Sequence, residues 1–217
     1  MLGGVELPVV LFAAVVSTLV LAGVAGGLAV HQHARASLER AWAAWARRHG
    51  LHYVAPTGEW PNRAPPRITG RVGGCPLHVE LVGARNADGT RYHTRVRARA
   101  IDPLPVALSA SRHGRIAPPA PLGDGLPSRT GDPYFDQEFV LRAIGGERVG
   151  ALLDANARRD LLRFASSASA SSVALEYLDG EVRLVWDGEE QAAWVLDEAR
   201  ALVARLSGAA PAGGPYR

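Results

Sequence analysis

Close to its start, the chain carries a run of 22 residues without a charged side chain, from Val9 to Val30. The only polar side chains in this run are those of Ser17 and Thr18. A bilayer with a hydrocarbon core about 30 Å thick is crossed by roughly 20 apolar residues in an α-helix, which satisfies its own backbone hydrogen bonds. The sequence therefore predicts a transmembrane helix over residues 9–30, preceded by a short N-terminus over residues 1–8.

The residues on either side of the apolar run predict its orientation. A cleavable signal peptide has a basic start and a shorter apolar core, whereas the first eight residues here contain Glu6 and no arginine. We therefore expect a retained anchor. Positive residues concentrate on the cytoplasmic side of a span, which predicts the inner (cytoplasmic) membrane, with the N-terminus outside and the C-terminal domain in the cytoplasm. The positive residues that follow the run are Arg35, Arg40, Arg47 and Arg48.

The segment after the anchor, residues 31–50, predicts a juxtamembrane helix, either continuous with the anchor or separate from it. It has no proline or glycine before Gly50, and Trp42 and Trp45 recur at helical spacing. Trp42 lies about 18 Å of helix beyond Val30, so we expect both tryptophans to pack on the domain rather than among lipid headgroups.

The rest of the chain is long enough for one domain with a core, which we place at residues 51–208, followed by a disordered tail over 209–217. All 24 basic residues are arginines, whose planar guanidinium groups suit carboxylates and phosphates. Cys75 is the single cysteine, which excludes an intrachain disulfide and a multi-cysteine metal site. No sequence motif indicates a metal site or a cofactor.

Alternating apolar and polar residues predict a mainly antiparallel sheet. Arg67–Val72 and Cys75–Val82 flank Gly73-Gly74 as a hairpin, and Arg91–Ile101 alternates more sharply. If Cys75–Val82 and Arg91–Ile101 pair with their apolar side chains on the same face of the sheet, the numbers of any two paired residues must add up to an odd sum. This rule places Glu80 opposite one of His93, Arg95 and Arg97.

The clearest hairpin is Val173–Trp186, with Asp179-Gly180 at its turn. A two-residue type I′ turn sets Val173 opposite Trp186 and Glu176 opposite Arg183. Further elements are expected as follows: a strand over Pro105–Ser111, a long loop over residues 117–133, a strand over Tyr134–Ala143 with Phe135, Phe139 and Leu141 inward, a helix over Val149–Ala165 with a second piece capped by Asp154, and a helix over Glu189–Ser207.

These elements predict an α+β fold, in which an N-terminal transmembrane helix precedes a mainly antiparallel sheet packed by two or three helices. The alternative architecture is a strand barrel capped by the C-terminal helix.

Three stretches also resemble a family of uncharacterised bacterial single-span membrane proteins: the tryptophan-bearing helix, GRVGGCPL at 70–77 and TGDPYFDQEFVL at 130–141. The resemblance implies a membrane-anchored α+β domain in the cytoplasm. It carries over no catalytic residue, because the family has no assigned activity.

Two groups of side chains are candidate sites. Arg95, Arg97 and Arg99 share one strand face at intervals of about 6.8 Å and could bind several phosphates or lipid headgroups. A solvated face paired with acids such as Glu80 is the alternative that we favour. Nucleic acid is disfavoured, because no aromatic residue interleaves these arginines.

The second group is acidic: Asp132, Asp136 and Glu138. Paired carboxylates can perform acid–base catalysis or hold a cation, but Thr-Gly-Asp-Pro is an ordinary turn sequence, which we favour. The function predicted is a membrane-tethered binding or scaffold domain, with anionic lipid headgroups or a membrane protein as partner. The alternative is a hydrolase-like enzyme that uses Asp132, Asp136 and a histidine.

Overall fold

The structure is a computed structural model that describes residues 6–58, 64–86, 89–112, 126–168 and 172–208. The chain divides into two compact units, residues 1–40 and residues 41–217, here called the first and second units. The tail over 209–217 and most of the long loop predicted at 117–133 lie outside the described residues, so these two predictions stay untested.

Helix α1 runs from Glu6 to Arg48 without a break, so the predicted anchor and the juxtamembrane helix are one element. It is long and apolar enough to cross a membrane, and none of its most apolar window is buried. The helix ends in a Schellman motif: Gly50 has a φ of 64°, Leu51 N–H donates to the Ala46 carbonyl at 2.8 Å, and Gly50 N–H donates to Arg47. Gly50 therefore ends the helix.

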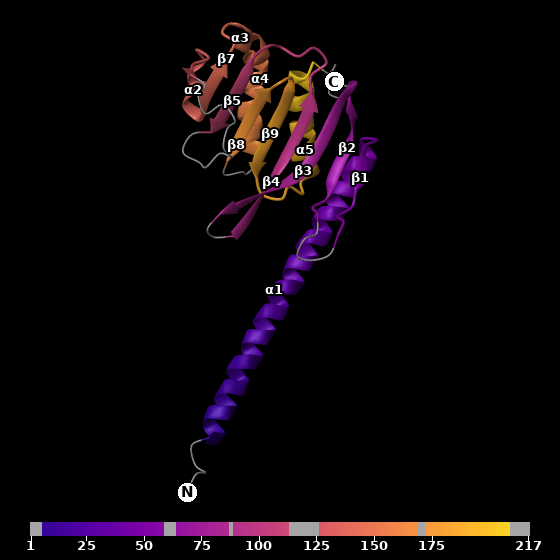
Figure 1. Cartoon of the computed structure of the whole chain (residues 1–217), viewed down its shortest axis with the longest axis vertical. Coiled ribbons are helices and arrows are strands. Elements are labelled where there is room, and N and C mark those ends of the chain that lie inside the picture. The colour runs from indigo at the N-terminus through magenta and orange to yellow at the C-terminus, as the bar shows by residue number, and fades with distance from the viewer. Residues whose placement is uncertain (1–5, 59–63, 87–88, 113–125, 169–171, 209–217) are drawn as a thin grey trace. The chain divides into compact units, whose positions relative to one another are not determined.

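Within the described residues, nine antiparallel strands form a single sheet in the order β1-β2-β3-β4-β9-β8-β5-β7-β6 (Figure 1). The sheet is open, since β1 and β6 are edges, so the α+β prediction is confirmed and the barrel alternative is wrong. The strands are β1 (His52–Val54), β2 (Arg67–Val72), β3 (Cys75–Asn86), β4 (Gly89–Arg99), β5 (Ala107–Arg112), β6 (Leu126–Ser128), β7 (Phe139–Ile144), β8 (Val173–Leu178) and β9 (Glu181–Asp187).

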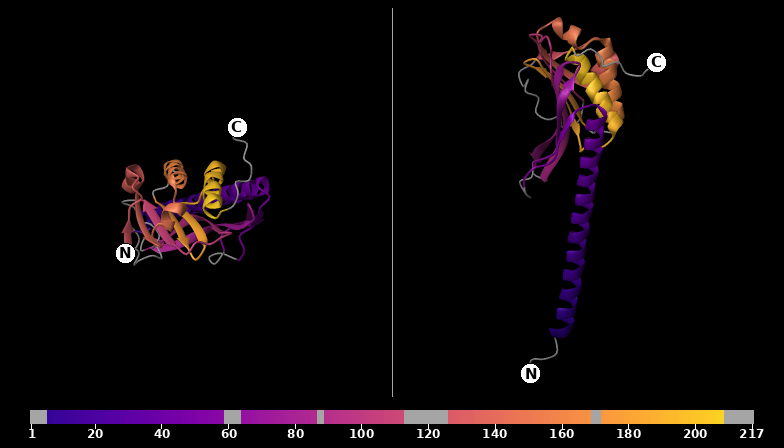
Figure 2. Two further views of the ribbon diagram at one scale, coloured as in Figure 1. Left: turned by 90° about the horizontal axis from the view of Figure 1, so that it is seen from above. Right: turned by 90° about the vertical axis from the view of Figure 1, so that its right-hand side faces the viewer.

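The described part of the second unit contains four further helices, and the two longest, α4 and α5, cover one face of the sheet (Figure 2). No described helix covers the opposite face, here called the open face. The helices are α2 (Pro133–Glu138), α3 (Arg148–Leu152), α4 (Ala155–Ser167) and α5 (Ala193–Leu206). Asp154 caps α4 as predicted, because its Oδ1 accepts from Ala157 N–H at 2.7 Å.

The registers predicted for the hairpins are confirmed. Val173 pairs with Trp186 and Glu176 pairs with Arg183, across a turn in which Asp179 and Gly180 have φ values of 52° and 74°. These positive values belong to the type I′ turn, which is why a two-residue Asp-Gly loop fixes the register. In the β3–β4 pair, Glu80 lies opposite Arg95, one of its three predicted partners.

The strand predicted over Tyr134–Ala143 is wrong in its first half, where the chain forms α2, and right in its second half, which is β7. Asp132 caps the helix, and Pro133 at its first position favours helical φ. Phe135 and Phe139 are four residues apart, a helical spacing, and their rings stack at 5.0 Å. Both rings are buried, as predicted, although the period of the pattern is 3.6 rather than 2.

The tryptophans near the end of α1 pack in the core of the second unit, as predicted. Trp42 and Trp45 have exposed fractions of 0% and 1%. The Trp42 indole N–H donates to the Glu190 carbonyl at 2.7 Å, and the Trp45 indole N–H donates to Asp197 Oδ1 at 2.8 Å. These bonds join residues 41–48 of α1 to α5 and to the segment that precedes it.

Candidate functional site

The arginine ladder lies on the open face of the sheet. On β4, Val96 and Ala98 point into the core and are buried, so the alternate residues Arg95, Arg97 and Arg99 point to the open face. Their neighbours on this face come from β3 and β9, which flank β4 on its two sides. The chemistry of the ladder therefore depends on residues of three strands.

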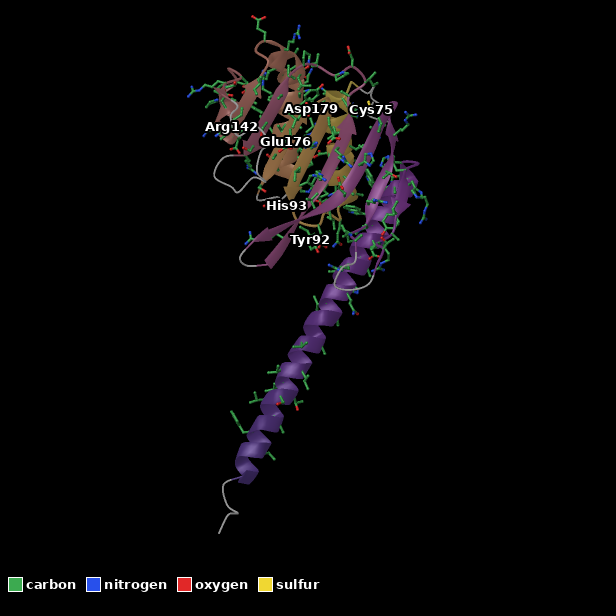
Figure 3. The ribbon with its side chains drawn as sticks, viewed as in Figure 1. Cys75, Tyr92, His93, Arg142, Glu176 and Asp179 are labelled. Atoms are coloured by element: carbon green, nitrogen blue, oxygen red, sulfur yellow. The ribbon has the colours of Figure 1, made fainter. Side chains whose placement is uncertain are left out.

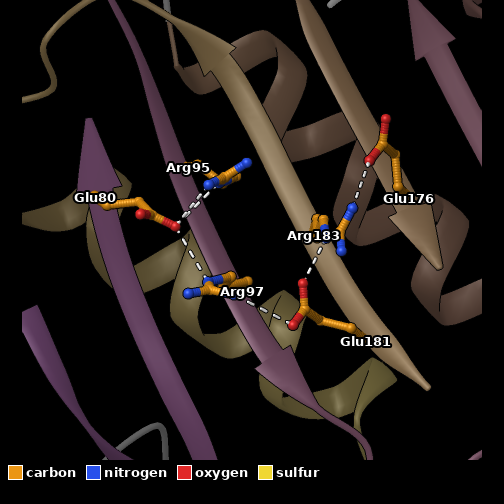
Figure 4. A network of polar contacts seen from close by, with 6 residues as sticks. All are labelled: Glu80, Arg95, Arg97, Glu176, Glu181 and Arg183. Atoms are coloured by element: carbon orange, nitrogen blue, oxygen red, sulfur yellow. Dashed lines mark hydrogen bonds and ion pairs between the residues drawn. The ribbon is translucent and has the colours of Figure 1, made fainter. Parts of the chain in front are cut away.

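The glutamates beside the ladder bind two of its arginines (Figure 4). Arg95 Nη2 lies 2.9 Å from Glu80 Oε1, and Arg97 Nε lies 3.1 Å from the same oxygen. Arg97 Nη1 also lies 3.4 Å from Glu181 Oε2. Arg97 therefore bridges two carboxylates from different strands.

Arg183 extends these contacts to β8. It forms an ion pair with Glu181 through Nε, and its Nη1 lies 3.9 Å from Glu176 Oε2. The resulting Arg–Glu network consists of Glu80, Arg95, Arg97, Glu176, Glu181 and Arg183.

Three guanidinium groups and three carboxylates give the Arg–Glu network a formal charge of zero when all are ionised. Opposite charges held this close cancel most of the field that would attract a separate anion. Arg99 is exposed at the end of β4, with Glu181 as its cross-strand neighbour. That Arg95, Arg97 and Arg99 bind an anion therefore stays a prediction. Arg95 and Arg97 are already paired with glutamates, which the sequence showed only in part.

Glu176 is the most buried member of the Arg–Glu network, with an exposed fraction of 6%. Burial raises the pKa of its carboxyl group, and the positive charges of Arg183 and Arg95 oppose the rise only in part. On the same face, burial and the charge of Arg97 lower the pKa of His78. Desolvation thus disfavours the charged form of both groups.

The predicted acidic cluster has structural contacts. Asp132 Oδ1 accepts from the backbone N–H groups of Tyr134 and Phe135 at 3.1 Å and 3.2 Å, and so caps α2. Its other oxygen lies 3.5 Å from Arg158 Nε. Glu138 lies at the end of α2 and pairs with Arg112 at 3.1 Å. Because these residues lie in a helix rather than in the strand predicted over Tyr134–Ala143, Asp136 and Glu138 do not share a strand face.

Asp136 holds the loop that leads into α2. Its Oδ1 accepts from the backbone N–H and the hydroxyl of Thr130, both at 2.9 Å, and its Oδ2 accepts from Gly131 N–H at 3.2 Å. Burial opposes ionisation, but these hydrogen bonds outweigh it and lower the pKa of Asp136. The carboxylate is therefore stabilised by the fold and has no raised pKa of the kind that a general acid needs.

Histidines described on the sheet lie far from this cluster. His78 and His93 are on β3 and β4, and three strands separate β4 from β7 in the sheet. With strands about 4.8 Å apart, the separation is roughly 19 Å. Among the described residues, no group of three or more potential ligands could hold a metal ion.

A groove of about 630 Å³ lies beside β6 and β7, a feature that the sequence analysis missed. Its apolar lining includes Leu141, Ile144 and Val149, and two guanidinium groups, those of Arg129 and Arg158, border it. Arg158 is engaged with Asp132 and with the Leu153 carbonyl, while Arg129 is exposed. Glu147 also lines the groove, so its border carries both signs of charge.

Comparisons with known proteins bear on the fold. No protein-family model and no curated protein matches this chain. Among solved structures, the crystal structure of the mycobacterial trehalose monomycolate transport factor A is similar, with a TM-score of 0.52 and 15% sequence identity. The alignment covers 82% of this chain and 98% of that chain. The chain therefore shares its overall fold with a transport factor.

Proposed function

We propose that this chain is a membrane-tethered accessory domain that serves a transport process at the membrane and has no catalytic role of its own. The observation that carries this proposal is the fold likeness, which spans nearly all of a transport factor and most of this chain. The apolar part of α1 supports the tether, because it has the length and composition of a membrane span.

The surface that we propose for a partner is the open face of the sheet. The Arg–Glu network presents both signs of charge there, with side chains that are 24–34% exposed at Glu80, Arg95, Arg97 and Glu181. A mixed pattern selects a partner with a complementary pattern of charges, which a protein surface provides and a uniformly anionic membrane does not. A membrane protein is therefore the proposed partner, and it would be part of the transport machinery.

The tether has a testable orientation. Arg35, Arg40, Arg47 and Arg48 follow the apolar run, so we expect the second unit on the cytoplasmic side. A reporter that is active only in the cytoplasm, fused after Arg217, should be active, and one that is active only outside the cytoplasm should be silent. The reverse pattern would refute the proposed orientation.

Asp136→Asn separates the accessory role from the hydrolase-like alternative. The folded pKa of Asp136 is lowered from 3.8, so its charge stabilises the fold above that pH, and the contribution is lost as the pH falls through the folded pKa. Neutralising it should cost about 0.5–1.5 kcal/mol at pH 7, and the cost should shrink in acid. The accessory role predicts that this less stable variant still complements a strain that lacks the chain.

The complementation assay should measure the transport of trehalose monomycolate, the molecule named for the structural neighbour, because the proposal concerns transport. A matched variant, Glu181→Arg, reverses one charge of the Arg–Glu network and is expected to abolish complementation while remaining folded. An Asp136→Asn protein that gains stability but fails to complement would instead favour catalysis by this carboxylate.

A further inference from the structure

The groove beside β6 and β7 lies on the side of the sheet that faces the helices. Leu141 and Ala143 of β7 line it, and Ser128 of β6 is directly opposite Leu141. Leu141 points into the core and is 4% exposed. Arg142, labelled on β7 in Figure 3, alternates with these residues and so points to the open face. The groove and the Arg–Glu network therefore lie on opposite sides of the sheet.

Helix α3 forms the other wall of the groove. The wall consists of Val149 and Gly150 of this helix, together with Leu153 directly after it. A Cβ atom added at Gly150 would meet no other atom within 4 Å, so the space beside the helix is open. The volume of about 630 Å³ falls within the range of roughly 300–1,000 Å³ that ligand sites have.

Opposite charges border the two ends of the groove. Because Ser128 is opposite Leu141, Arg129 is level with the second residue of β7. Glu147 lies beyond the last residue of β7, just before α3. Four steps of about 3.4 Å separate the second and the last residues of the strand, which places the two charges about 14 Å apart along it.

Both charges are available to a ligand. The side chains of Arg129 and Glu147 are exposed, and neither has an ion-pair partner among the described residues. Arg129 affects Asp136 only through its charge, and Glu147 precedes α3 without a capping hydrogen bond from its side chain. The other cation of the groove, Arg158, is already paired with Asp132 at 3.5 Å.

This spacing of charges fits a polypeptide better than an amphiphile. An amphiphile carries its charges together at one end, whereas the groove has one charge at each end and apolar residues between them. In an extended segment, residues i, i+2 and i+4 point to one side, and about 14 Å separates the first from the last. Recognition through side chains is expected, since Pro127 of β6 has no backbone N–H for strand addition.

We propose that the groove binds an extended segment of a protein partner. An apolar side chain of the segment enters the groove, an acidic residue two positions away binds Arg129, and a basic residue two positions away on the other side binds Glu147. The inference goes beyond the proposed function, because it gives the second unit another protein-binding surface, separate from the open face.

The test measures the binding of three dye-labelled peptides with blocked ends: Glu-Thr-Leu-Thr-Lys, Glu-Thr-Leu-Thr-Glu and Lys-Thr-Leu-Thr-Lys. The full chain is reconstituted in phosphatidylcholine nanodiscs, which keep detergent out of the groove, and fluorescence anisotropy gives the affinities. We expect the peptide with both signs of charge to bind the wild type about three- to tenfold more tightly than the other two.

Charge reversal at either end should change which peptide is preferred. Arg129→Glu should bind the peptide with two lysines most tightly, and Glu147→Arg the peptide with two glutamates. A general defect in folding does not produce such an exchange. Unchanged preferences in both variants would overturn the proposal. A wild type that prefers the peptide with two glutamates would also overturn it, and would indicate a site for an anionic ligand.

Filling the groove tests its place in the fold. Gly150→Phe should lose binding of all three peptides, because the added ring occupies the open space beside α3. The matched control is Ala151→Phe, since Ala151 is exposed in the same helix and lies outside the groove. It should bind as the wild type does, and so should Glu181→Arg, which alters the open face. Binding by Gly150→Phe equal to that of the wild type would refute the groove as the site, whatever the outcome for the proposed function.

Discussion

Replacing Phe135 by alanine is expected to destabilise the second unit by about 3–5 kcal/mol, because the substitution leaves a cavity in the core. Phe135 is 0% exposed, and its ring stacks on that of Phe139 at 5.0 Å, which fastens α2 to β7. For a domain of this size the melting temperature should fall by about 6–20 °C. Thermal unfolding of the full chain in detergent, followed by near-ultraviolet circular dichroism, would measure the loss of tertiary packing without interference from α1.

The matched control is Tyr134→Ala, one residue away in the same helix. Tyr134 is 77% exposed, and surface substitutions of this kind usually change stability by less than about 0.5 kcal/mol. If the two variants melted together, the packing of α2 against β7 would be refuted.

The packing of Phe135 also explains why the secondary structure of this segment was predicted only in part from the sequence. Burial of Phe135, Phe139 and Leu141 was predictable, because each is a large apolar residue and large apolar residues are most often buried. The spacing of the apolar residues was ambiguous, since these three positions fit either one strand or a helix followed by a strand. Asp132 and Pro133 are the local signal for the helix start, but Thr-Gly-Asp-Pro is equally typical of a turn.

The pairing of strands joined by a short turn was predictable, whereas the pairing of strands far apart in the sequence was not. The β8–β9 register follows from Asp179-Gly180, because a two-residue turn leaves one alignment that buries every apolar side chain. The pairing of β4 with β9 joins Arg97 to Arg183 across more than 80 residues of chain, and no turn fixes it. Sequence alone could not show which two strands would be neighbours.

The prediction of the candidate site from sequence was incomplete for the same reason. The ladder of Arg95, Arg97 and Arg99 was assigned to the correct strand and face, and Glu80 was named as a partner. The Arg–Glu network became visible only with the sheet order, since Glu181 reaches Arg97 of the ladder from β9, and Glu176 of β8 pairs with Arg183 of β9. The groove beside β6 likewise combines residues from distant segments.

The end of α1 offers the second large effect, at Trp45. Its side chain is 1% exposed, its indole N–H donates to Asp197 Oδ1 at 2.8 Å, and His49 Nε2 lies 2.7 Å from the same oxygen. Trp45→Ala should cost about 3–5 kcal/mol through the lost packing, and the loss of a donor to a carboxylate adds to the cost. We expect the same spectroscopic unfolding assay to show the loss.

Trp45→Phe separates the loss of stability due to packing from the loss due to the hydrogen bond. The phenyl ring keeps most of the packing and removes only the hydrogen bond to Asp197, which for a charged acceptor contributes about 1.5–3 kcal/mol. The order of stability should therefore be wild type, then Trp45→Phe, then Trp45→Ala. A double-mutant cycle of Trp45→Phe with Asp197→Ala isolates the bond, because the coupling between the two positions cancels their separate packing effects. A coupling near zero would mean that the indole N–H does not bind Asp197, and that packing alone joins the end of α1 to α5.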